Sequence, residues 1–82
     1  MSDQKLLERI VCNPQVMVGK PVIKGTRLTV ESVLNQLAHG SSPEAILAEY
    51  EGLTSDDIQA CLLFASHSLS STVFLPLGAE SA

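Results

Sequence analysis

Residues 29–67 read TVESVLNQLAHGSSPEAILAEYEGLTSDDIQACLLFASH and contain three successive segments with helical signals. Thr29 can cap the first segment, whose apolar residues recur at the three- and four-residue spacing of one buried helix face. Gly40 and Gly52 follow the first two segments, where glycine commonly ends a helix. The pattern predicts helices over residues 30–39, about 43–51 and about 54–67.

The second and third segments carry start signals of their own. Ser42 can cap a helix whose first residue is Pro43, a position that tolerates proline. Thr54 is followed three residues later by Asp57, which resembles a capping box with Asp in place of the usual Glu. The second and third helices, joined through Gly52, have the spacing of a helix-turn-helix motif. We therefore expect a three-helix core of that type.

The segment Gly19 to Arg27 reads GKPVIKGTR and holds three of the five Lys and Arg residues of the chain. Val22-Ile23 and Arg27-Leu28 flank Lys24-Gly25-Thr26, a pattern that predicts a small hairpin with Gly25 at a positive φ. Pro21 lacks an amide hydrogen, so it should lie at a sheet edge or begin a strand. The expected fold is therefore mainly α, with a short β-hairpin ahead of three helices.

The domain organisation follows from these elements and from composition. Residues 1–9 form a polar lead-in with one possible helical turn, and residues 10–67 form a single domain that includes a β-prone run from Ile10 to Cys12. Residues 68–82 form a tail that is either disordered or pinned on a partner, and its apolar run at residues 73–75 favours pinning. Charged residues interrupt the N-terminus, so no signal peptide is expected and a cytoplasmic location is the default.

Charge and hydropathy limit the classes of function. Residues 1–30 carry a net charge of +3, whereas residues 31–82 carry seven carboxylates and neither Lys nor Arg. The overall charge of −4 argues against non-specific binding to nucleic acid or to anionic membranes. A mean hydropathy of +0.24 is high for 82 residues. We therefore expect exposed apolar surface and a homodimer or a stable protein partner.

No catalytic or metal-binding pattern is present in the sequence. His39 and His67 lie at predicted helix ends, where an imidazole interacts favourably with the helix dipole. The two cysteines, Cys12 and Cys61, have neither CxxC nor zinc-finger spacing with the histidines. No phosphate-binding loop motif follows Gly25. The sequence predicts a protein that is not an enzyme and that needs no cofactor or metal.

DNA binding remains an alternative function. The second helix of a helix-turn-helix motif places its first residues in the major groove, where Gln59 can pair with adenine and Leu63 lies nearby. Asp56 and Asp57 would repel phosphates there. Lys20, Lys24 and Arg27 form a second possible DNA contact; in the competing interpretation Arg27 bridges to Glu31 and the lysines are solvated.

The chain resembles the bacterial family known as domain of unknown function 433. The resembling residues are Asn13-Pro14, Gly19 to Arg27, Val30 to Val33, Gly40, Tyr50, Leu53-Thr54 and Asp57-Ile58. The resemblance implies a homeodomain-like helical core with a small β element, often dimeric. It also implies an antitoxin-like protein encoded beside a toxin that resembles PIN-type nucleases, with the pair repressing its own promoter.

We therefore expect a non-enzymatic, antitoxin-like module that binds and neutralises a PIN-type nuclease, as a homodimer without membrane association. The alternative is a transcriptional regulator that uses the helix-turn-helix or the basic hairpin. The candidate partner- or DNA-binding residues are Lys20, Lys24, Arg27, Gln59, Leu63 and Phe74. The residues expected to shape the backbone are Gly19, Pro21, Gly25, Thr26 and Gly52.

Overall fold

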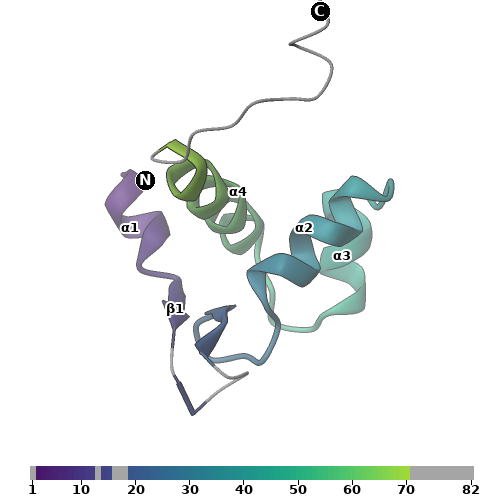
Figure 1. Ribbon diagram of the computed structural model, residues 1–82. Helices are drawn as coiled ribbons and strands as arrows, with labels where there is room; N and C mark the ends of the chain where they lie inside the picture. The colour runs from purple at the N-terminus through teal and green to yellow at the C-terminus, as the bar shows by residue number, and fades with distance from the viewer. Residues whose placement is uncertain (1, 13, 16–18, 71–82) are drawn as a thin grey trace, which may run out of the picture.

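The computed structural model describes residues 2–12, 14–15 and 19–70, and these form four helices and a two-stranded sheet (Figure 1). The elements are α1 (Asp3–Leu7), β1 (Ile10–Cys12), β2 (Pro21–Ile23), α2 (Val30–Ala38), α3 (Pro43–Glu49) and α4 (Ser55–Ser70). The expected fold class is confirmed: the chain is mainly helical, and a short antiparallel β element precedes the three longer helices.

The two-stranded sheet pairs β1 with β2. Ile10 lies opposite Ile23, and Cys12 lies opposite Pro21, which begins β2 as its missing amide hydrogen predicts. The predicted second strand at residues 27–28 does not form; an isolated bridge from Val22 to Thr29 and a hydrogen bond of 3.0 Å from the Ile23 amide to the Leu28 carbonyl oxygen join the two sides of the turn. Thr29 is already the N-cap of α2, so the chain has no room for a longer strand before the helix.

The turn itself forms as expected. Gly25 has a φ of 82°, a conformation that side chains disfavour. The hydroxyl of Thr26 donates to the carbonyl oxygen of Ile23 at 2.7 Å and accepts from the amide of Leu28 at 3.0 Å. This threonine therefore satisfies backbone groups on both sides of the turn and aims the chain into α2.

The helix start signals are confirmed by their hydrogen bonds. Thr29 and Ser42 each accept from the amide three residues ahead, at 3.0 and 3.1 Å. The amide of Thr54 donates to the carboxylate of Asp57 at 2.9 Å, and the amide of Asp57 donates to the Thr54 hydroxyl at 3.4 Å, which completes the capping box. The last helix, however, continues beyond His67 to Ser70.

The core joins the sheet to two helices. Its buried cluster consists of Ile23 from β2, Val30 and Val33 from α2 and Cys61 from α4. Half-buried side chains pack around it: Ile10, Leu28, Leu34, Leu37, Leu53 and Phe64. Figure 1 shows α2 and α4 side by side above the strands, and their mutual packing agrees with this view.

The predicted lead-in contains a helix that packs on α4 (Figure 1). Arg9, which follows it, places Nη1 3.1 Å from Asp57 Oδ1 and Nη2 3.6 Å from Asp56 Oδ2. The ion pair with Asp57 is partly buried and joins residues 48 positions apart. The N-terminal segment is thus attached to the start of α4.

The two thiols differ sharply in environment, and this predicts their reactivity. Cys12 is exposed, whereas Cys61 is buried in the core. Burial, with a smaller contribution from the charge of Asp57, raises the pKa of Cys61 from 9.0 to about 11. At pH 8 such a shift reduces the reactive thiolate about 100-fold. Alkylation by iodoacetamide should modify Cys12 rapidly and Cys61 only after unfolding; equal rates, followed by peptide mass spectrometry, would contradict this arrangement.

No helix among the described residues is both long and apolar enough to cross a bilayer.

Candidate protein-binding surfaces

The structure separates the three basic candidates instead of gathering them. Lys20 lies beside α2, with its Nζ 3.2 Å from Glu31 Oε1. Lys24 lies in a different hollow, near Arg9, and Arg27 lines a third. The ion pair with Glu31 that one interpretation gave to Arg27 is therefore made by Lys20. These side chains do not form a single basic patch.

The candidate DNA-reading residues, Gln59 and Leu63, lie on α4, whose first turn carries two carboxylates. Gln59 is exposed and Leu63 is half-buried. Asp56 and Asp57 occupy the first turn of α4, and both are held by Arg9. Since residues 43–70 contain neither Lys nor Arg, a DNA backbone approaching this helix would meet carboxylates without a cation on α3 or α4.

Two of the glycines that were expected to shape the backbone have a positive φ. Gly19 precedes β2 with a φ of 80°, and Gly52 joins α3 to α4 with a φ of 88°. Phe74 lies outside the described residues, as does the rest of the segment 71–82.

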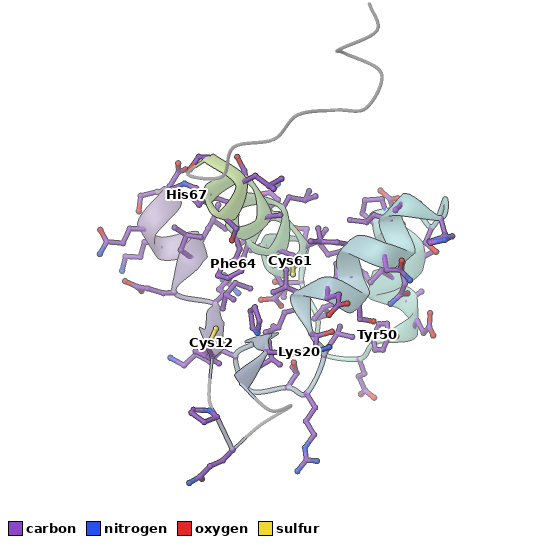
Figure 2. All side chains as sticks on the ribbon, in the orientation of Figure 1. Cys12, Lys20, Tyr50, Cys61, Phe64 and His67 are labelled. Carbon is purple, nitrogen blue, oxygen red and sulfur yellow. The ribbon has the colours of Figure 1, made fainter. Side chains whose placement is uncertain are left out.

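An open groove runs between α2 and α4, and it is a feature that the sequence did not reveal. Its apolar lining comes from both helices and from the start of β2: Pro21, Val30, Leu34, Ala38, Phe64, Ala65 and Leu69. Lys20 and Glu31 are its charged lining residues, and they pair with each other. Figure 2 shows Phe64 on α4 and Lys20 near the strands. We call this feature the α2–α4 groove.

Leu69 is the most exposed large apolar side chain in the groove, at 64% of its full accessible surface. Sequence reasoning missed it because the serines around it suggested a tail beginning at residue 68. The hydroxyl of Ser68 donates to the carbonyl oxygen of Phe64 at 2.9 Å, and that of Ser70 donates to the carbonyl oxygen of His67 at 2.8 Å. These serines thus bond within the helix, which carries Leu69 on its last turn.

A second surface surrounds α3 and is acidic. Glu44 lies in its first turn, Glu49 is its last residue, and Glu51 follows in the turn to α4. All three are exposed, and none forms an ion pair with another described residue. We call Glu44, Glu49 and Glu51 the acidic surface.

Helix stability does not explain the acidic surface at its C-terminal end. Carboxylates at the C-terminus of a helix oppose its dipole and cost a few tenths of a kcal/mol each. Arg27 lies in the same hollow as Glu49 and Glu51, but without an ion pair to either. The charges of Glu49 and Glu51 are therefore available to a partner.

The described residues contain no group of three or more His, Cys, Asp and Glu side chains that could hold a metal ion. His39 lies just beyond α2, where its Nδ1 is 2.8 Å from the carbonyl oxygen of Asn35.

Comparison with known proteins places this fold among relatives. The family model described as "Protein of unknown function (DUF433)" matches residues 10–65. The crystal structure of a DUF433 member from Anabaena variabilis is similar with a TM-score of 0.73 and 28% identity, over 82% of this chain and 66% of that one. An uncharacterized protein from Archaeoglobus fulgidus is 62% identical over 26 residues, which are 32% of this chain and 72% of that protein.

Proposed function

The chain belongs to the DUF433 family of proteins of unknown function, and on that premise we propose that it is a non-enzymatic module that binds and neutralises a PIN-type nuclease. The antitoxin-like role comes from the family resemblance set out above. The observation that carries it in this chain is the acidic surface, Glu44, Glu49 and Glu51, whose charges have no ion-pair partner among the described residues.

Charge complementarity is the physical reason for this choice. A nuclease that cleaves RNA presents cationic groups and metal ions to the phosphate backbone. Exposed carboxylates on a binding partner complement such a site, accelerate association and exclude the nucleic acid by occupying the same charges. The position of Glu49 and Glu51 against the α3 dipole fits a binding role better than a stabilising one.

Co-expression with the product of the adjacent gene, followed by size-exclusion chromatography, tests the proposal. We expect one co-eluting complex in which nuclease activity on RNA is suppressed. Replacing Glu44, Glu49 and Glu51 together by glutamine should weaken binding by about 10- to 100-fold, because each lost charge contact contributes about 0.5–1 kcal/mol, and should flatten its salt dependence.

Glu31→Gln is the matched control for the glutamine variant. It also removes one exposed carboxylate, but one that is paired with Lys20 and lies in the α2–α4 groove. Its effect on nuclease binding should be under about threefold, the range of a surface ion pair. Separate elution of the wild-type chain and the nuclease would refute the proposed function.

The DNA-binding alternative is tested in parallel by a mobility-shift assay on the upstream promoter at low and physiological salt. Saturable, sequence-dependent retardation that Arg27→Ala abolishes would favour a regulator. The carboxylates in the first turn of α4 and the dispersal of Lys20, Lys24 and Arg27 favour the nuclease instead.

A further inference from the structure

The exposed large apolar side chains of the described residues lie on one helix. Leu62 is 49% exposed and Leu69 is 64% exposed, and both belong to α4. They differ in surroundings, because Leu69 lines the α2–α4 groove and Leu62 does not. An apolar groove with a protruding leucine in its lining offers both a cavity to fill and a side chain that can fill one.

We propose that the α2–α4 groove binds a second copy of this chain in a two-fold dimer, with Leu69 of each copy inserted into the groove of the other. A two-fold axis brings the same surface of both copies together, so a protrusion and a groove on one face satisfy each other twice. The assembly then closes as a dimer and leaves neither feature exposed.

Charge favours a second copy over a charged partner at this surface. Two chains with a net charge of −4 each repel one another, so they can associate closely only through a region of little net charge. The groove meets this condition, because its charged residues, Lys20 and Glu31, neutralise each other at 3.2 Å. The acidic surface lies outside it, since neither Glu44, Glu49 nor Glu51 lines the groove.

The shape of the groove suits a leucine side chain. The lining combines the small side chains of Ala38 on α2 and Ala65 on α4 with the larger Leu34 and Phe64, so it offers space beside large apolar side chains. Such a surface accepts a branched apolar side chain with native-like packing. The remaining lining residues are mostly neutral and polar, such as Asn35 and Ser68, which is typical of an interface rim.

Sedimentation velocity of the full chain over a range of micromolar concentrations tests the dimer. The wild-type chain should sediment as a dimer. Leu69→Glu should raise the dimer dissociation constant at least 100-fold, because each copy would bury one carboxylate in the apolar groove of the other. Leu62→Glu is the matched control: the same change, on the same helix, at an exposed leucine outside the groove. It should leave the dimer intact.

Two results would overturn the proposal. One is a monomeric wild-type chain at every concentration; if such a chain became dimeric in Phe74→Glu, its own C-terminal segment would be the occupant of the groove. The other is an equal loss of dimer in Leu62→Glu and Leu69→Glu, with both variants folded by circular dichroism. Neither of these results depends on nuclease binding, so the two proposals fail separately.

Discussion

Replacing Ile23 by alanine should lower the free energy of unfolding by about 3 kcal/mol, within the range of 2–5 kcal/mol for removing a large buried aliphatic side chain. Ile23 is 2% exposed and belongs to the same buried cluster as Val33 and Cys61. Its side chain is the point where the two-stranded sheet joins α2 and α4. The loss therefore leaves a cavity between three elements, and urea denaturation at fixed protein concentration measures it.

Leu62→Ala provides the control for this prediction. It also truncates a large aliphatic side chain, but one that is 49% exposed and outside the buried cluster. Its cost should stay below about 1 kcal/mol, because little apolar area leaves water at this site on folding. Equal destabilisation by the two variants would show that the core does not centre on Ile23.

Asp57→Ala should destabilise the fold by about 2–3 kcal/mol, because it removes two interactions at once. The carboxylate accepts from the amide and the hydroxyl of Thr54, at 2.9 and 3.1 Å, and so caps α4. Its other oxygen lies 3.1 Å from Arg9 Nη1 in a partly buried ion pair. Thermal and urea unfolding of the variant measure the sum of these losses.

Asp56→Ala is the control for Asp57→Ala, because it removes a neighbouring carboxylate that pairs with Arg9 and leaves the cap formed by Asp57 in place. Asp56 also pairs with Arg9, but at 3.6 Å and with a more exposed side chain. Its replacement should cost less than about 1 kcal/mol, as exposed ion pairs do. Asp57→Asn should fall between the two alanine variants, because an amide oxygen retains the cap but not the charge. A larger effect for Asp56→Ala than for Asp57→Ala would contradict the capping-box geometry.

The helices were predictable because their signals are local. Thr29 and Ser42 each cap the amide three residues ahead, and Thr54 and Asp57 cap each other over the same distance. Interactions over so few residues leave a recognisable spacing in the sequence. The pairing of β1 with β2 was not predictable in this way, because the strands are separated by a segment whose length does not fix the partner.

The candidate site was less predictable for the same reason. Lys20, Lys24 and Arg27 are close in sequence. However, β2 lies between Lys20 and Lys24, and the Gly25 turn lies between Lys24 and Arg27. Each of the three side chains lines a different hollow. The α2–α4 groove depends on how two helices cross, and the ion pair between Arg9 and Asp57 joins residues 48 positions apart. Neither follows from spacing along the chain.

Folding offsets part of the division of charge along the sequence, because Arg9 pairs with Asp56 and Asp57 and Lys20 pairs with Glu31. The charge that remains without an ion-pair partner among the described residues includes the carboxylates of α3, which lies on the opposite side of the molecule from α1 (Figure 1). A charged partner therefore experiences a torque before contact and arrives with one preferred side forward. This pre-orientation raises the rate of productive encounter and weakens as added salt shortens the Debye length.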